Sequence, residues 1–205
     1  MNEISLHVVT NFGDGTVLAP LVVFIAGWTY WCGWKSGAAV LGSSLLGAGL
    51  LITAEKLVMI GCGPAIPVFA IHSPSGHAAL SAAVYGSLAL VTGRQERTPT
   101  RYALYLAAAA LIGLIAWSRV VLQLHTVGEV IVGLFTGGAM CVVTGTLLSP
   151  QPAGLTLRWR PAAAVGSTIM LSFQVLALFR GPPLAIEGWV HGWARILGDA
   201  FACSG

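Results

Sequence analysis

Six long apolar runs separated by short polar breaks limit what this chain can fold into. The runs cover about residues 17–34, 38–62, 76–92, 102–121, 126–148 and 162–179. A helix of about 20 apolar residues crosses the hydrocarbon core of a bilayer. Charged residues make up only 8% of the chain, against roughly 25% in soluble domains. The sequence therefore predicts an all-α, polytopic membrane protein, one domain over residues 1–205 with a six-transmembrane-helix bundle.

Two segments outside these runs allow further structural predictions. Residues 1–16 contain no lysine or arginine, so they lack the positive region of a secretory signal, and the first run is expected to be retained. Residues 186–201 hold Trp189 and Trp193. Because tryptophan favours the membrane–water interface, this stretch is predicted to form a C-terminal interfacial helix.

Positive residues are distributed unevenly among the breaks. The breaks after the first, third and fifth runs hold Lys35, Arg94, Arg97, Arg101, Arg158 and Arg160. Apart from the motif residues below, the other side holds Arg180 and Arg195. Because positive loops stay in the cytoplasm, we expect an inner (plasma) membrane protein with both termini and the motifs on the periplasmic side. The expected partners are the bilayer and a membrane lipid rather than a nucleic acid; the oligomeric state stays open.

A short polar strip, Ser73 to His77, opens the third apolar run. The free N–H groups and positive dipole of a helix start attract anions. Gly76 lets a ligand oxygen approach the backbone closely, and Ser75 adds a hydroxyl donor. Arg119, at the end of the fourth run, can grip two phosphate oxygens with its planar guanidinium. Together these groups predict a phosphate site.

His125 and Glu129 are four residues apart at the start of the fifth run, so they share one helical face. A carboxylate that holds one imidazole nitrogen leaves the other free to attack. His77 would then be the general acid that protonates the leaving oxygen. This pattern favours two-step phosphoryl transfer through a phosphohistidine, with no metal or cofactor, because cations and a helix start can neutralise the developing charge.

At these residues the chain resembles the type 2 phosphatidic acid phosphatases, whose motifs are K-x6-R-P, P-S-G-H and S-R-x5-H-x3-D. The second motif is intact as Pro74 to His77. The third reads Ser118, Arg119, His125 and Glu129 with the family spacing, and the first reads Lys56 followed by Gly63-Pro64. The resemblance covers residues 56–129 and implies a helical membrane phosphatase in which Lys56 is a phosphate ligand.

Two residues depart from the family pattern. Glu129 replaces an aspartate, which keeps the charge and adds a methylene, so we expect its orienting role to persist. Gly63 replaces an arginine that helps to hold the phosphate. Arg180 is predicted to end the sixth run on the same side, and it is either a surrogate phosphate ligand or a boundary anchor that snorkels to the interface.

Several other polar residues have competing interpretations. Asp14 or Thr16 is expected to cap the first helix, and a role for Asp14 near the substrate is the alternative. Lys56 is a ligand or a snorkelling side chain. Glu55 is functional, or it pairs with another cation. His72 is interpreted as an incidental loop histidine, and a catalytic role is the alternative.

Features outside the motifs are given structural interpretations. The charged segment 93–101 is predicted to be a solvated cytoplasmic turn. Gly133, Gly137 and Gly138 favour close helix packing over a flexible hinge. The cysteines are Cys32, Cys62, Cys141 and Cys203, and they lack metal-ligand spacing. Cys62 and Cys203 either form a disulfide or remain free thiols.

The substrate class comes from the resemblance. The resemblance implies a substrate from one of these groups, and the short loops favour a lipid: phosphatidic acid, phosphatidylglycerophosphate, undecaprenyl diphosphate, lipid A phosphates or sugar phosphates. Two alternatives belong to other classes. One is a catalytically weakened relative that binds or transports anionic lipids, which the loss at Gly63 motivates. The other is a structural membrane subunit.

Overall fold

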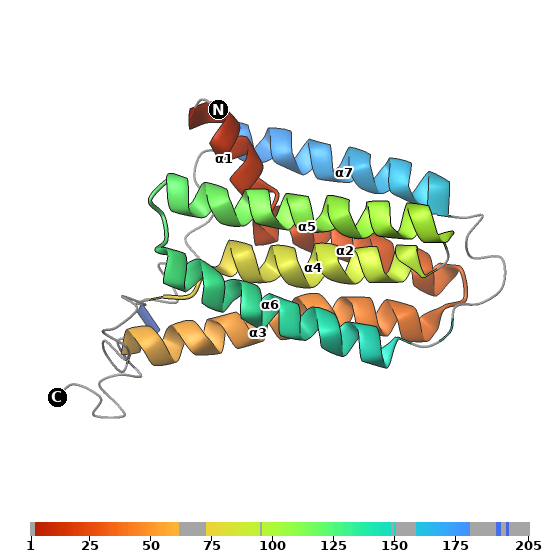
Figure 1. Cartoon of the computed structure of the whole chain (residues 1–205), viewed down its shortest axis with the longest axis horizontal. Helices are drawn as coiled ribbons and strands as arrows, with labels where there is room; N and C mark the ends of the chain where they lie inside the picture. Colours follow the sequence, from red (N-terminus) through yellow and green to blue (C-terminus); the bar gives the residue numbers. More distant parts are fainter. Residues whose placement is uncertain are drawn as a thin grey trace.

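The computed structural model describes residues 3–61, 73–94, 96–148, 150, 159–180, 192–193 and 196. Seven helices account for nearly all of this part, and it contains no strand. They are α1 (Glu3–Asn11), α2 (Gly15–Trp31), α3 (Lys35–Gly61), α4 (Gly76–Gly93), α5 (Thr98–Val121), α6 (Val127–Leu147) and α7 (Trp159–Arg180). The long helices run roughly alongside one another in one bundle (Figure 1). The all-helical prediction is confirmed.

Helices α2 to α7 correspond to the six predicted runs, with small shifts at their ends. The largest shift is in α5, which begins at Thr98 rather than at 102 because Pro99 occupies its first turn, where a missing N–H costs nothing. Of the predicted interfacial helix, residues 192–193 and 196 are described, and they are helical. Its other residues lie outside the described part, as do Cys62, Gly63, His72, Arg158 and Cys203.

Helix α1 was not predicted, because nine residues are too few for a clear apolar period. Leu6 and Thr10, four residues apart on one face, are buried. The helix is bent by 44° from α2, and it packs against α5 and α7. Figure 1 shows it across the end of the bundle where α7 finishes.

The membrane character of the chain is visible in its surface. Val23, Leu106 and Phe135 are more than two-thirds exposed on the bundle exterior. By length and composition, α3, α5 and α6 can each cross a membrane, and the bent pair α1–α2 would add a fourth span. The count of six stays a prediction.

Helix α4 lies between the other long helices and packs most extensively against α6 (Figure 1). Glycines make this close approach possible: a Cβ at Gly133 would collide with the carbonyl oxygen of Ser75, and one at Gly137 with that of Ala79. Gly138 has open space where its Cβ would be. The packing prediction therefore holds for two of the three glycines.

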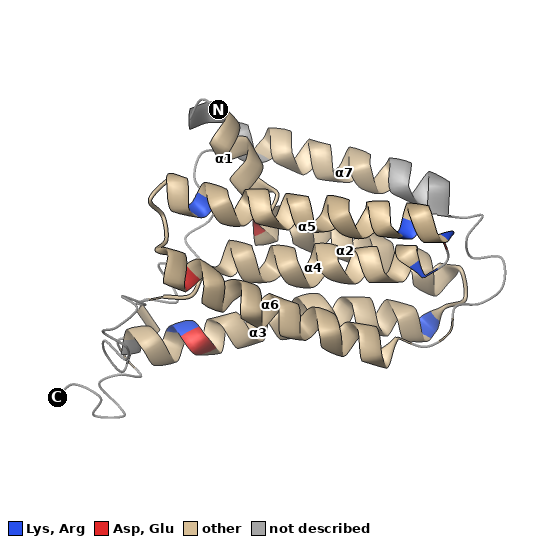
Figure 2. Cartoon of the chain, in the orientation of Figure 1, with Lys and Arg blue, Asp and Glu red and all other residues tan. Residues whose placement is uncertain are grey.

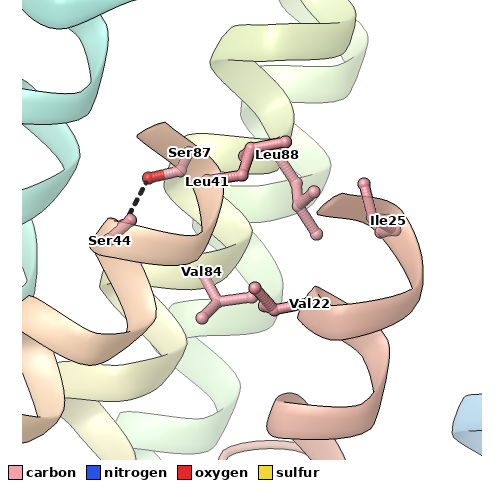
Figure 3. A pocket seen from close by; sticks show the side chains of 7 residues that line it. All are labelled: Val22, Ile25, Leu41, Ser44, Val84, Ser87 and Leu88. Carbon is pink, nitrogen blue, oxygen red and sulfur yellow. Dashed lines mark hydrogen bonds between the residues drawn. The ribbon is translucent and has the colours of Figure 1, made fainter. Parts of the chain in front are cut away.

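A buried serine pair lies between α3 and α4, beside apolar side chains of α2. Ser44 and Ser87 are buried, and their hydroxyl oxygens are 3.0 Å apart. They border a cavity of about 10 Å³, which Val22, Leu41 and Val84 help to line (Figure 3). This volume holds about one water molecule. The cavity is too small for a substrate.

Charged residues gather near the two ends of the bundle (Figure 2). At the end opposite to the sequence motifs, Arg94 Nη1 and Nη2 donate to the carbonyl oxygens of Leu148 and Gly145, at 2.9 and 2.5 Å. Arg101 Nε donates to the Gly93 carbonyl oxygen at 2.9 Å. These arginines cap the C-termini of α6 and α4. Residues 94 and 96–100 are exposed, as the prediction of a solvated turn requires, and the two arginines add helix caps.

Candidate active site

The segment that joins α5 to α6 places His125 and Glu129 together. Thr126 caps α6 in a capping box, in which its hydroxyl accepts from the Glu129 N–H and its own N–H donates to Glu129 Oε2. His125 Nδ1 lies 3.0 Å from the same carboxylate oxygen. Because an ionised carboxylate only accepts, Nδ1 carries the hydrogen, and Nε2 is the nitrogen with a lone pair. The predicted pair is thus formed.

The turn before His125 is set by how α5 ends. Leu124 N donates to the Arg119 carbonyl oxygen and Gln123 N to that of Val120, which is the Schellman arrangement. Gln123 adopts a left-handed φ of 54°, a conformation that costs a non-glycine residue about 1–2 kcal/mol. His125 N also donates to the Arg119 carbonyl oxygen, at 3.2 Å. The backbone of Arg119 therefore fixes the position of the histidine.

Glu129 also ties the two main motifs to each other. Its Oε1 accepts from Ser73 N at 2.9 Å, and its carbonyl oxygen accepts from Ser75 N at 3.0 Å. Ser73 is 56 residues away along the chain. One residue thus orients His125 and fixes the strip that opens α4.

The start of α4 has the features that the phosphate prediction requires. Ser75 is fully buried at the N-cap, and its hydroxyl has no hydrogen-bond partner among the described residues. Outside its chain neighbours and the backbone of its own helix, no described atom lies within 4 Å of where a Cβ of Gly76 would be. An unsatisfied buried donor beside open backbone suits an anionic oxygen.

Two cations lie near His125. The side chains of Lys56, on α3, and Arg119, on α5, are 8% and 7% exposed. Arg119 Nη1 donates to Thr10 Oγ1 of α1 at 3.2 Å. Burial lowers the pKa of His125, and the charges of Arg119 and Lys56 lower it further against the opposing effect of Glu129. These effects together favour the neutral form of His125.

His77, in the first turn of α4, has an acidic neighbour from the α1–α2 turn. Its Nε2 lies 3.4 Å from Asp14 Oδ2. Asp14 also caps α2, since its Oδ1 accepts from the N–H and the hydroxyl of Thr16, both at 2.7 Å. The expected helix cap is therefore present. Asp14 also lies beside the candidate site, as the alternative interpretation predicted.

The structure brings Ser75, His77, Arg119, His125 and Glu129 to one end of the bundle, where Lys56 also lies. Glu55 accepts from Thr136 Oγ1 at 2.7 Å, and the described residues give it no ion pair with a cation. Arg180 ends α7, but its side chain is outside the described part, so its role stays a prediction.

Thr10 and the Ser73 amide were not foreseen as parts of this site. Thr10 lies in an unpredicted helix, and a backbone donor leaves no trace in the residue type. The T-x-x-E spacing of Thr126 and Glu129 is a signal that could have located the capping box.

Comparisons with known proteins agree with the motifs. The chain is 28% identical over 168 residues to an uncharacterized 22.5 kDa protein in the cps region of Klebsiella pneumoniae, covering 78% of each chain. No solved structure matches it. The family model of the PAP2 superfamily matches residues 58–151, which include the second and third motifs in full. The chain is therefore similar to the PAP2 superfamily over a little under half of its length.

Proposed function

We propose that this protein is an integral membrane phosphatase that cleaves lipid phosphate or diphosphate esters through a phosphohistidine at His125. The match to the family model of the PAP2 superfamily suggests phosphatase activity. The observation that carries the proposal is the position of Glu129, which bonds His125 Nδ1 and also holds the strip of Ser75 and His77. A nucleophile, its orienting carboxylate and an anion-binding helix start are thereby adjacent.

In the proposed cycle the lipid tail stays in the bilayer, and the phosphate lies among Lys56, Arg119, the Ser75 hydroxyl and the Gly76 N–H. His125 Nε2 attacks phosphorus while the bond to the ester oxygen breaks, and the His77 imidazolium gives that oxygen its proton. Neutral His77 then takes a proton from water, whose oxygen attacks the phosphohistidine. Inorganic phosphate leaves and His125 is restored. The cations and helix start stabilise the developing charge without a metal.

The membrane setting narrows the substrate class. A six-span topology with the positive breaks in the cytoplasm puts the site at the periplasmic face of the inner membrane. The apolar exterior and the short connections described above favour a lipid substrate over a soluble one. Phosphatidic acid, phosphatidylglycerophosphate and undecaprenyl diphosphate are the substrates to test first.

The decisive assay is phosphate release from these lipids in detergent, with wild type beside His125→Ala. The wild type is expected to turn over at least one lipid with a chelator present, and His125→Ala to turn over none. Because a nitrophenolate leaves without protonation, His77→Ala should accumulate an acid-labile phosphoenzyme from a nitrophenyl phosphate, which His125→Ala should not form. Turnover that persists in His125→Ala would refute the proposed nucleophile.

A second candidate function is lipid binding or transport without turnover. Gly63, where the family motif has arginine, favours it because one phosphate-binding cation is missing. Saturable binding of a lipid phosphate by wild type without phosphate release would support this alternative.

A further inference from the structure

The turn between α1 and α2 is fixed to α4, the helix that carries His77. The Tyr85 hydroxyl donates to the Phe12 carbonyl oxygen at 2.7 Å. At Gly13, a Cβ would lie 3.0 Å from the carbonyl oxygen of His77 and 3.2 Å from its Cβ. The turn therefore packs directly on the backbone of His77, and only glycine fits there without displacing a neighbour.

This packing brings the Asp14 carboxylate to the imidazole. One oxygen, Oδ1, is used by the cap of α2, while the other, Oδ2, lies 3.4 Å from His77 Nε2. The two side chains are 10% and 20% exposed, so water screens their interaction only in part. An N-cap needs one acceptor oxygen. The second oxygen of Asp14 is therefore available to act on His77.

The charges around His77 come from every helix that packs on α4. Among the described residues of the elements that pack on α4, the charged or titratable groups at this end are Asp14 before α2, Lys56 and Glu55 on α3, Arg119 on α5, and His125 and Glu129 at the start of α6. Lys56 and Arg119 disfavour a protonated imidazole. Glu129 is engaged by His125 and the Ser73 amide, and Glu55 by Thr136. Asp14 contacts His77 itself.

We propose that Asp14 is a positioning residue that orients His77 and stabilises its imidazolium, so that His77 can serve as the general acid of the proposed phosphatase reaction. Each of the two histidines then has its own carboxylate: Glu129 prepares His125 to attack, and Asp14 keeps His77 ready to donate. With the Nε2 hydrogen directed at Asp14, the leaving oxygen receives the Nδ1 proton. Asp14 itself gains and loses no proton in the cycle.

The test compares Asp14→Asn with Thr16→Val. Asparagine is as good an N-cap as aspartate, so Asp14→Asn removes the charge and retains the cap. Thr16→Val removes the hydroxyl bond to Oδ1 but leaves the charge and the N–H bond of the cap, so it reports on the loss of a polar contact to Asp14 without loss of charge. We expect Asp14→Asn to lower turnover of an alkyl phosphate roughly tenfold. This loss is part of the ~10²–10⁴-fold rate enhancement that general acid catalysis contributes.

Two readouts separate this role from a structural one. In Asp14→Asn the basic limb of the pH–rate profile should move down by about one pH unit, while phosphoenzyme formation from a nitrophenyl phosphate stays unchanged because that leaving group needs no proton. Thr16→Val should leave the limb in place. An unmoved limb in Asp14→Asn, or equal losses with both substrates, would overturn the proposal.

A measurement that does not need turnover keeps this proposal distinct from the proposed function. In protein with ¹⁵N-labelled histidine, the protonation midpoint of His77 should fall by about one pH unit in Asp14→Asn, and His77→Gln identifies the signal. Turnover in wild type without this shift would refute the role of Asp14 and leave the phosphatase intact. If the protonation midpoint shifts but the protein shows no turnover, the interaction between Asp14 and His77 is supported and its part in a reaction is refuted.

Discussion

Glu129 shows how one side chain can satisfy structural and chemical requirements together. Its carboxylate accepts from Ser73 N, Thr126 N and His125 Nδ1. The capping box needs a glutamate or glutamine at this position, because the side chain must reach back to the N-cap N–H. The added methylene relative to the family aspartate supplies that reach.

Exchanging Glu129 should separate its two functions. We expect Glu129→Gln to reduce turnover about 10–100-fold, the usual effect of removing an orienting partner, with the helix cap largely retained because glutamine also forms a capping box. Glu129→Asp should keep more activity and lose about 1 kcal/mol of unfolding free energy. Turnover and thermal unfolding in detergent measure both effects. Greater activity in Glu129→Gln than in Glu129→Asp would contradict the orienting role.

The buried position of His125 predicts the acid side of the pH profile. Its pKa is lowered from 6.5, chiefly by burial, so the neutral nucleophile persists below pH 6.5 and the acid limb of kcat/KM should lie there. Lys56→Met removes a cation that lowers this pKa and should move the limb to higher pH. An acid limb above pH 6.5 in wild type would contradict the burial argument.

The same pKa shift affects stability. The unfolded chain takes up the proton near pH 6.5, before the folded protein does. The contribution of neutral His125 to the free energy of unfolding is therefore fully present above this pH. It is lost as the pH falls through the pKa of His125 in the folded protein. Unfolding midpoints recorded in parallel with the rates would show this loss.

At the scale of helices, the apolar runs predicted α2 to α7 well because a hydrophobic stretch of that length has few other stable states in a bilayer. Helix α1 could not be predicted in this way. Its formation depends on tertiary contacts, including the buried Leu6 and the bond from Arg119 to Thr10. Short helices of this kind gain their stability from packing rather than from sequence period.

Adjacent glycines of α6 offer a matched test of helix packing. Gly137→Ala should lower the unfolding free energy by about 1–3 kcal/mol, because its methyl group would collide with the backbone of α4. Gly138→Ala should be neutral or slightly stabilising, because open space faces that position and alanine favours helix. Thermal unfolding in detergent distinguishes them. Equal effects would show that α4 and α6 are less closely packed than described.

Across the whole molecule, sequence motifs predicted which residues meet at the site, and the structure brings them to one end of the bundle. The ordered spacings were sufficient for His125 and Glu129, since a single helical turn joins them. The contact between Asp14 and His77 was not predictable to the same degree, because it depends on the bend between α1 and α2 and on Gly13. Such a contact requires the path of the chain in three dimensions.

The proposed orientation in the membrane can be tested at two exposed positions. In a variant with its four cysteines replaced by serine, Gln123→Cys lies at the site end and Glu96→Cys at the opposite end. An impermeant maleimide should label Gln123→Cys in spheroplasts, and Glu96→Cys only after lysis. The reverse pattern would place the site in the cytoplasm.

The bonds of Glu129 to both halves of the site have a consequence for biogenesis under the proposed function. Helix α4 is synthesised before α6, yet the strip at its start is held by a residue that emerges from the ribosome more than fifty positions later. A nascent chain would therefore carry no complete phosphate site until both helices have inserted and met. The enzyme would stay latent during insertion, without a separate inhibitor.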